Sequence, residues 1–363
     1  MELAELGWDT FLAESFEAAA AGAGCVPARV IREERGLYLL LAALGELSAQ
    51  VSGAFAHGAE STADYPAVGD WVVCAPVAGA RTATILAVLP RKSCFRRKEP
   101  GARAEEQVVA ANVDTVFVVS GLDGGRNFNV RRIERYLVLC RDSGAAPVCV
   151  LNKADLCAEP DGFVKEAQAV AIQVPVHVVS ALTGAGLEAL TGYAGPGRTV
   201  ALLGPSGVGK SALINALLGA ERQATAAVRP GDLRGRHTTT RRELFVLPAG
   251  GMLIDTPGMR ELQLWGDAES VRGTFPEIEA LAERCRFRDC RHMGEPGCAV
   301  EAAAAAGTLD AGRYESYRKL QKELAHLARR RDVRHRANPK ARWKDISKLV
   351  RDLHTRPDSK FET

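Results

Sequence analysis

A glycine-rich stretch in the second half of the chain has the residue types and spacing that hold the phosphates of a nucleotide. It follows the pattern G-x-x-x-x-G-K-S from Gly204 to Ser211, after the apolar run 199–203 and before the helix-forming run 212–218. In such a turn, glycines let backbone N–H groups face phosphate oxygens, and the helix N-terminus adds a partial positive charge. We predict that Lys210 reaches the β- and γ-phosphates and that Ser211 ligates Mg²⁺.

Two shorter elements, each at the end of an apolar run, have the residues to recognise a base. They are Asn152-Lys153-Ala154-Asp155 and Ser180-Ala181-Leu182. A carboxylate at Asp155 can accept hydrogen bonds from guanine N1–H and from the exocyclic amine, which adenine does not offer. Lys153 would pack its aliphatic stem over the base, and a backbone N–H of the second element would support it. Together with the phosphate loop, these elements predict a guanine nucleotide site.

The Mg²⁺ ion and the γ-phosphate need further ligands, and a D-x-x-G pattern from Asp255 to Gly258 fits that role. Its carboxylate would lie near Mg²⁺ through water, and the glycine N–H would face the γ-phosphate. The polar segment 234–240 lies between the two phosphate-binding elements and contains Thr238 and Thr239. One of these threonines is the expected second Mg²⁺ ligand, and the sequence does not say which.

The order of these elements is a circular permutation of the order in Ras-type GTPases. Here the base-reading residues 152–155 and 180–182 precede the phosphate loop, whereas in Ras-type chains they follow it. The chain after Gly258 therefore continues directly into the C-terminal part. We predict that a nucleotide-driven movement of the loop at residues 255–258 is transmitted to the C-terminal part as a domain movement.

The residue that activates water for hydrolysis is not obvious from the motifs. Met259 follows Gly258, where Ras-like enzymes carry a glutamine that orients the attacking water, and Met cannot do this by hydrogen bonding. One possibility is slow intrinsic hydrolysis that a partner accelerates. The other is a substitute side chain, for which His237 is the best candidate, the alternative being an ordinary surface histidine.

A compact cluster of soft ligands lies beyond the nucleotide motifs. Cys285, Cys290, His292 and Cys298 fall within 14 residues, with glycine and proline between them to bend the chain. Three cysteines cannot all pair as disulfides, and four such ligands describe a closed structural Zn²⁺ site. We therefore predict one zinc ion per chain.

The C-terminal segment is strongly basic. Residues 312–363 contain 16 Lys or Arg against 7 Asp or Glu, although the whole chain carries a net charge of only +3. A helix over 314–331 would bury Tyr317, Leu320, Leu324 and Leu327 on one face, and the charge continues beyond it. The basic residues either form a solvated helix or, as the neighbouring zinc site favours, contact RNA phosphates.

The elements that must position these residues belong to two classes. Short strands separated by turns over about 25–95 predict a small OB-like β-barrel, and strands alternating with helices from about residue 108 predict a doubly wound, mostly parallel sheet. Between them, the basic residues of 91–98 form either a solvated linker or an RNA-facing edge. The predicted parts are an N-terminal extension over 1–24 (a short helix and a linker), the barrel over 25–104, the permuted GTPase domain over 105–276, and a zinc-binding domain with a basic helical tail over 277–363.

Composition limits the protein class. Hydrophobic residues make up 47% and charged residues 25% of the chain, and no apolar run approaches the ~20 residues of a membrane span. We expect a monomeric, cytoplasmic protein with no membrane partner.

With these residues in place, the chain from about 25 to 345 resembles the RsgA (YjeQ/EngC) family, the ribosome small-subunit-dependent GTPases. The barrel, the permuted motifs, the switch string Gly235-Arg236-His237-Thr238-Thr239 and the zinc pattern carry the resemblance. It implies a late assembly factor that binds the small ribosomal subunit and its rRNA, hydrolyses GTP to GDP when the subunit stimulates it, and then departs. Residues 1–24 and about the last 15 match no motif of the family.

Carried over by position, the resemblance implies zinc on the four ligands already named and a catalytic histidine at His237. It implies nucleotide contacts at Asn152, Lys153, Ala154, Asp155, Gly204, Pro205, Ser206, Gly207, Val208, Gly209, Lys210, Ser211 and Ala212. Two other functions stay open: a GTP-gated RNA-binding switch with little turnover, and a GTPase that acts on another RNA, such as tRNA or the large subunit.

Overall fold

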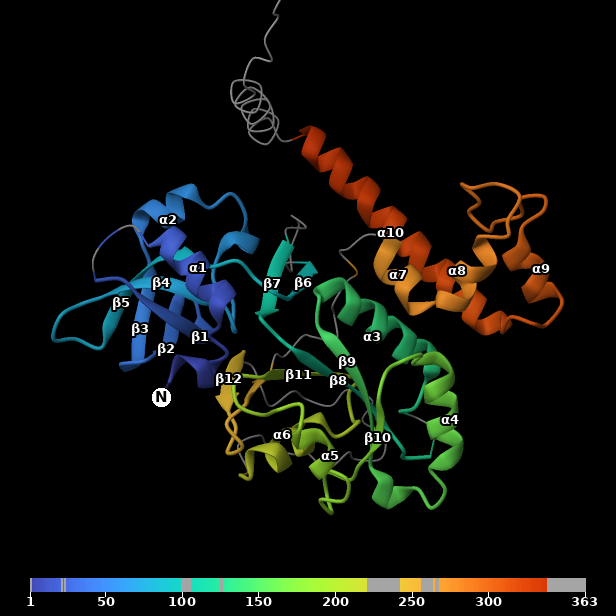
Figure 1. Cartoon of the computed structure of the whole chain (residues 1–363), viewed down its shortest axis with the longest axis horizontal. Coiled ribbons are helices and arrows are strands. Elements are labelled where there is room, and N and C mark those ends of the chain that lie inside the picture. The colour runs from blue at the N-terminus through green and yellow to red at the C-terminus, as the bar shows by residue number, and fades with distance from the viewer. Residues whose placement is uncertain are drawn as a thin grey trace, which may run out of the picture.

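A computed structural model describes residues 2–20, 22, 24–98, 106–124, 127–220, 242–255, 264 and 268–337. Figure 1 shows a β-barrel in blue, a larger sheet flanked by green and yellow helices, and an orange-to-red helical part beside them. Among the described helices, none combines the length and the apolar character that crossing a bilayer requires.

Five strands close the N-terminal barrel. They are β1 (Val26–Glu34), β2 (Leu37–Ala42), β3 (Gly45–Val51), β4 (Trp71–Pro76) and β5 (Thr82–Val88). β1 pairs with both β2 and β4, and β3 runs parallel to β5, so the order β1-β2-β3-β5-β4 returns to β1. Arg35 and Gly36 join the first hairpin with positive φ values of 53° and 81°, as a two-residue primed turn requires. The predicted barrel is confirmed.

The central sheet is mostly parallel, as predicted. Its order is β10-β9-β8-β11-β13-β12, in which only β12 is antiparallel to its neighbour β13. These strands are β8 (Thr115–Gly121), β9 (Ala146–Asn152), β10 (Val176–Val178), β11 (Thr199–Leu203), β12 (Glu243–Val246) and β13 (Met252–Asp255). The connecting helices are α3 (Val130–Ser143), α4 (Asp161–Val170), α5 (Glu188–Thr191) and α6 (Lys210–Leu218), with a short 3₁₀ turn η3 (Ala154–Leu156).

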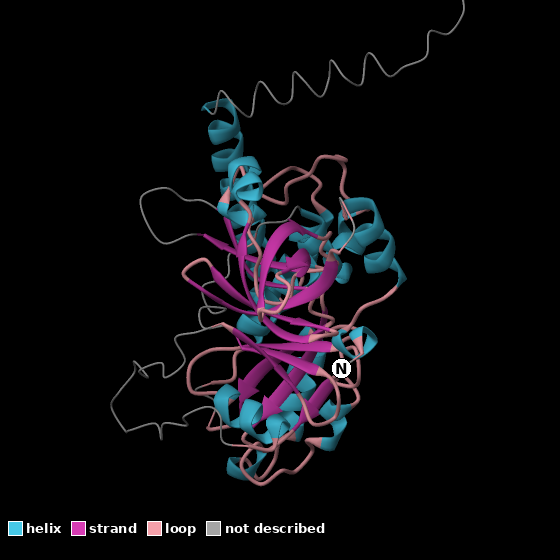
Figure 2. Cartoon of the chain, turned by 90° about the vertical axis from the view of Figure 1, so that its left-hand side faces the viewer, coloured by secondary structure: helices cyan, strands magenta, loops and turns pink. Residues whose placement is uncertain are grey.

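Alternation along β8 shows why helices cover both faces of this sheet. Val116 and Val118 are buried in the same cluster as the α3 residues, whereas Phe117 and Val119 are buried with Leu213 of α6. Successive strand side chains point to opposite faces, so a strand that is apolar throughout must be covered twice. Figure 2 shows the resulting arrangement, with strands at the centre and helices outside.

The barrel and the central sheet are joined edge to edge. β1 pairs with β12 at Arg32 and Glu243, whose side chains also form an ion pair at 3.6 Å. The two sheets thus form one continuous array of eleven strands.

The N-terminal segment is more than a helix and a linker. It forms η1 (Leu3–Leu6) and α1 (Thr10–Ala19), and Leu6 and Leu12 are fully buried. The ring of Trp8 lies edge-on to Trp71 of the barrel, with centroids 4.7 Å apart. Because it completes the hydrophobic core, this segment is an integral part of the fold.

A second pairing of strands corrects the reading of the basic residues after the barrel. β6 (Cys94–Lys98) and β7 (Glu106–Ala111) form a separate two-stranded sheet. Earlier in the chain, α2 (Gly53–Gly58) and η2 (Thr62–Asp64) lie between β3 and β4. Arg91 makes a bidentate ion pair with the buried Asp70, in which Nε donates to Oδ1 at 2.8 Å and Nη2 donates to Oδ2 at 2.7 Å. Lys92 pairs with Asp9 and Arg96 with Glu106. Arg91 thus has a structural role, and residues 94–98 form a strand and not a linker; the RNA-facing edge stays a prediction.

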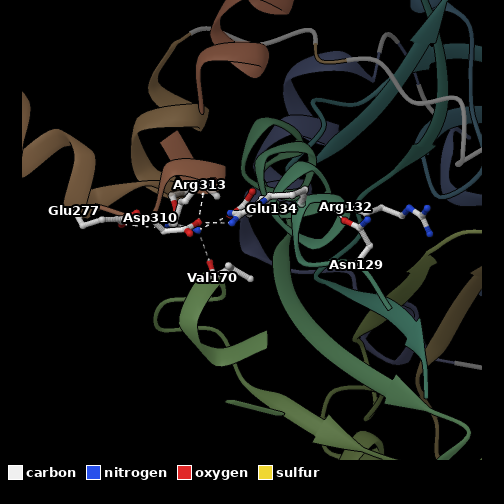
Figure 3. A network of polar contacts seen from close by, with 9 residues as sticks. Asn129, Arg132, Glu134, Val170, Glu277, Asp310 and Arg313 are labelled. Atoms are coloured by element: carbon white, nitrogen blue, oxygen red, sulfur yellow. Dashed lines mark hydrogen bonds and ion pairs between the residues drawn. The ribbon is translucent and has the colours of Figure 1, made fainter. Parts of the chain in front are cut away.

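The C-terminal helices pack on α3 of the central domain. They are α7 (Ala268–Thr274), α8 (Pro276–Ala282), α9 (Ala299–Ala305) and α10 (Ala311–Ala337). Arg313 of α10 is buried, and it binds Glu134 of α3 at 3.0 Å, Glu277 of α8 and the carbonyl oxygens of Val170 and Thr274 (Figure 3). The predicted apolar face of α10 lies inward, where Tyr317, Leu320 and Leu324 are buried.

Candidate functional site

The glycine-rich loop lies between β11 and α6, as predicted. Gly207 and Gly209 have φ values of +82° and +90°, which only glycine adopts without strain, and α6 begins directly afterwards at Lys210. A Cβ on Gly204 would lie 2.5 Å from the carbonyl oxygen of Val119, so the loop is pressed against β8. The Lys210 ammonium donates to the carbonyl oxygens of Gly204 and Pro205, at 2.8 and 2.7 Å.

The Asn152 side chain connects this loop to both base-reading elements. Its amide nitrogen donates to the carbonyl oxygen of Val208 at 2.9 Å, and its amide oxygen accepts from the N–H of Ala181 at 3.0 Å. Asn152 is only 1% exposed, and a Cβ on Gly209 would lie 2.4 Å from its nitrogen. The structure therefore brings residues 152–155, 180–182 and 204–211 to one place at the ends of three parallel strands.

Asp155 is held in place from the neighbouring loop. The Ser180 hydroxyl donates to its carboxylate and itself accepts from the N–H of Thr183 at 3.1 Å. Lys153, two residues earlier, has a left-handed φ of +68°, and the following N–H, of Ala154, donates to the carbonyl oxygen of Val179. The Asp155 side chain remains exposed, so an incoming base can reach it.

Two residues of this site carry no recognised motif and were missed. Asp123 follows β8, and its Oδ2 accepts from the Lys153 ammonium and from the Asn127 amide, both at 2.7 Å. Burial alone would raise the pKa of Asp123, but these two hydrogen bonds outweigh it and lower the pKa below the usual value. The signal that could have found Asp123 is its position, since Asn152, Ser180 and the start of the phosphate loop also lie at the carboxyl ends of parallel strands.

Asp255 ends β13, next to the phosphate loop. Burial raises its pKa to about 6, with Lys210 opposing this increase and Glu243 adding to it. The remaining predicted residues of this region, namely His237, Thr238, Thr239 and Gly258, lie outside the described residues.

The four predicted zinc ligands come together in the helical part. Their ligand atoms all lie within 4.8 Å of one another, with His292 Nδ1 3.3 Å from Cys298 Sγ and 3.7 Å from Cys285 Sγ. Zinc–ligand bonds of about 2.0–2.3 Å in a tetrahedron separate ligand atoms by about 3.3–3.8 Å, so the cluster fits zinc. Burial lowers the pKa of His292, which favours the neutral ring that a metal requires.

The surroundings of this cluster fix its geometry. His292 has a left-handed φ of 56°, and its carbonyl oxygen accepts from the Tyr314 hydroxyl of α10 at 2.7 Å. Cys298 is the N-cap of α9, where its sulfur accepts from the N–H of Glu301. The cluster thereby links α9 to α10.

Comparison with known proteins gives a consistent result. The family model described as RsgA GTPase matches residues 88–265. A protein of Opitutus terrae named small ribosomal subunit biogenesis GTPase RsgA is 50% identical over 355 residues, which cover 95% of this chain and 96% of that protein. A second, from Lactiplantibacillus plantarum and named small ribosomal subunit biogenesis GTPase RsgA 2, is 47% identical, with 84% of each chain covered.

A solved structure agrees with these relatives. YjeQ from Thermotoga maritima superposes with a TM-score of 0.63 and 28% identity, covering 83% of this chain and 99% of the other. The barrel, the permuted nucleotide loops and the Cys₃His cluster are thus accompanied by strong sequence similarity along nearly the whole chain. The chain belongs to the RsgA family of GTPases.

Proposed function

We propose that this chain hydrolyses GTP to GDP as a late factor in biogenesis of the small ribosomal subunit, binds rRNA of that subunit, and leaves it after hydrolysis. The names of the curated relatives support the ribosomal role. The observation that carries the nucleotide role is the Asn152 bridge, because it joins the phosphate loop, through Val208, to the loop of Ala181. The buried Asn152 amide thus connects the base-reading element 152–155 to the phosphate loop and to the loop of Ala181.

The proposed roles follow the position of each residue. The base would contact residues 152–155 together with Ser180 and Ala181, and the phosphates would contact residues 204–212. Mg²⁺ would be held by Ser211 and by Thr238 or Thr239, with Asp255 acting through water and the Gly258 N–H near the γ-phosphate. His237 is proposed to assist the attack of water on the γ-phosphate.

We further propose one structural zinc on Cys285, Cys290, His292 and Cys298. When bound, the ion would cross-link the segments on either side of it and add to the hydrophobic contacts of the buried Phe275, Val300 and Tyr317. The basic helix and tail would then contact rRNA phosphates. The proposed parts of the chain remain 1–24, 25–104, 105–276 and 277–363, in a monomeric cytoplasmic protein.

The decisive experiment measures GTP hydrolysis with increasing amounts of purified small ribosomal subunits. The rate is expected to rise with subunit concentration and then to saturate. Lys210→Ala should abolish the stimulated rate, and Lys165→Ala, an exposed lysine on α4, should leave it unchanged. Tight GTP-dependent binding to subunits with no stimulation would instead identify a binding switch with little turnover.

A sedimentation experiment tests the RNA partner. The chain, loaded with a non-hydrolysable GTP analogue, is pelleted with isolated small or large subunits. Co-sedimentation with the small subunit is expected. Co-sedimentation with the large subunit alone would favour a GTPase that acts on another RNA. The same conclusion would follow if the chain pelleted with neither subunit but was retained on a column carrying tRNA.

A further inference from the structure

The turn after β8 takes part in the nucleotide site, although it matches none of the predicted motifs. Asp123 and Asn127 lie in this turn, directly before α3. Asn127 donates to Asp123 Oδ2 at 2.7 Å and so orients the carboxylate toward Lys153. The other oxygen, Oδ1, is buried and has no hydrogen-bond partner among the described residues. The carboxylate therefore depends on Lys153 as its counter-ion.

Lys153 needs such an anchor because of what its side chain is proposed to do. A lysine has four rotatable bonds, and its ammonium is strongly hydrated when free, so an unpaired Lys153 would sample many positions. The Asp123–Lys153 ion pair at 2.7 Å joins side chains that are only 19% and 21% exposed. The Lys153 ammonium is thereby fixed at Asp123, and the aliphatic stem must run from the carboxyl end of β9 to that carboxylate.

The stem follows the phosphate loop. A Cβ on Gly209 would lie 3.9 Å from Lys153 Cε, and a Cβ on Gly207 would lie 3.6 Å from the Asn127 amide nitrogen. The two glycines thus mark how closely the Lys153 stem and the Asn127 amide approach the loop. The turn after β8, the start of the base-reading element and the phosphate loop form one packed layer.

We propose that Asp123 is a positioning residue for guanine binding. Its carboxylate holds the Lys153 ammonium, so that the lysine stem forms a preset apolar surface for the face of the base. Asp123 itself does not contact the nucleotide. This inference rests on the proposed guanine-nucleotide function and adds to it a residue outside the known motif positions of this sequence.

The test is a double-mutant cycle on GDP binding to the full-length chain, measured by isothermal titration calorimetry. Asp123→Asn keeps the shape of the side chain but removes its charge, and we expect GDP affinity to fall about tenfold, the effect of one charge-assisted hydrogen bond. Lys153→Met keeps most of the apolar stem without the ammonium and should cause a similar loss. The double variant should be no worse than either single variant, because both remove the same contact.

Controls separate positioning from folding. Asp161→Asn, an exposed aspartate at the start of α4, should leave GDP affinity unchanged. Asp123→Asn should raise KM for GTP, with little change in kcat at saturation and in the melting temperature of the nucleotide-free chain. A merely structural defect would lower that melting temperature and would be additive with Lys153→Met.

Two results have distinct meanings. Unchanged GDP affinity in Asp123→Asn, or losses that add in the double variant, would overturn the positioning role while leaving the proposed function intact. A parent chain that binds GDP no better than ADP would instead overturn the proposed function itself.

Discussion

Asn152 illustrates how a single side chain can require one residue type. Its amide gives a hydrogen bond to one loop and accepts one from another, at 2.9 and 3.0 Å, in a position that is 1% exposed. A carboxylate could not donate, and an apolar residue would leave the Val208 carbonyl oxygen and the Ala181 N–H unpaired. The neighbouring Gly209 is equally constrained, because a Cβ there would collide with this amide.

The first prediction concerns Gly209→Ala. The new Cβ would lie 2.4 Å from the Asn152 amide nitrogen, at a φ of +90° that alanine rarely adopts. We expect a loss of GTP affinity of about a hundredfold, corresponding to about 2.7 kcal/mol, since both the loop and the Asn152 bridge must shift. Titration with GTP measures it. Gly192→Ala is the matched control, because no atom lies within 4 Å of its Cβ position; equal losses in the two variants would contradict the explanation.

At the scale of elements, β1 belongs to two parts of the fold, the barrel and the central sheet. It closes the barrel by pairing with β2 and β4, and it reaches the central sheet through β12. Its Arg29 is 1% exposed and donates to the carbonyl oxygens of Leu6, Gly69 and Asn112 and to the Thr199 hydroxyl of β11. Burial lowers the pKa of Arg29 to about 10, so the side chain remains a cation at neutral pH.

The second prediction concerns Arg29→Met. Methionine fills a similar volume but leaves several buried carbonyl oxygens without a donor, each of which costs about 1–3 kcal/mol. We expect the free energy of unfolding to fall by about 3 kcal/mol, measured by urea denaturation. Arg81→Met, at an exposed arginine between β4 and β5, should change it by less than about 0.5 kcal/mol. A loss below about 1 kcal/mol in Arg29→Met would show that water replaces the guanidinium.

For the whole molecule, the question is how the C-terminal helices are held on the GTPase domain. The buried Arg313 binds Glu134 on α3 and Glu277 on α8, and the Arg313 guanidinium lies 4.6 Å from the Phe275 ring centroid. Further out, Arg135 of α3 binds Glu323 of α10 through both carboxylate oxygens. Since α3 follows the turn whose Asp123 pairs with Lys153, these contacts place α10 on the helix next to the candidate nucleotide site.

The third prediction concerns the zinc cluster. The purified chain should contain about one zinc per molecule, and Cys290→Ala should contain almost none. Without zinc, α9 should lose protection from hydrogen exchange, because its N-cap Cys298 would no longer be tied to His292 by the ion, whereas β8 and β9 should keep theirs. Cys157→Ala, at a half-buried cysteine outside the cluster, should keep the metal. Full protection of α9 after zinc removal would show that the helices pack without the ion.

Local signals accounted for a large part of the fold. The helix-forming run 212–218 lies within α6, the short strands over 25–95 form the barrel, and the strand–helix alternation from about residue 108 forms the central sheet. These elements are encoded by apolar periodicity and turn residues close together in the chain. By contrast, the two-stranded sheet of β6 and β7 and the antiparallel strand β12 were not predicted. β12 has only four residues and is defined by its pairing with β13 in the sheet.

The sequence by itself determined the kind of chemistry. The phosphate loop, the base-reading elements and the zinc ligands are short motifs whose spacing predicts the ligand class, and the family of the chain agrees with the GTPase part of that prediction. Only the tertiary structure decided which distant residues support them. Asp123 pairs with Lys153, which is 30 positions away in the sequence, and Arg29 donates to the Thr199 hydroxyl, 170 positions away. Arg91 forms an ion pair with Asp70. Such pairs leave no periodic or local pattern, because they form only when separate strands and helices pack against one another.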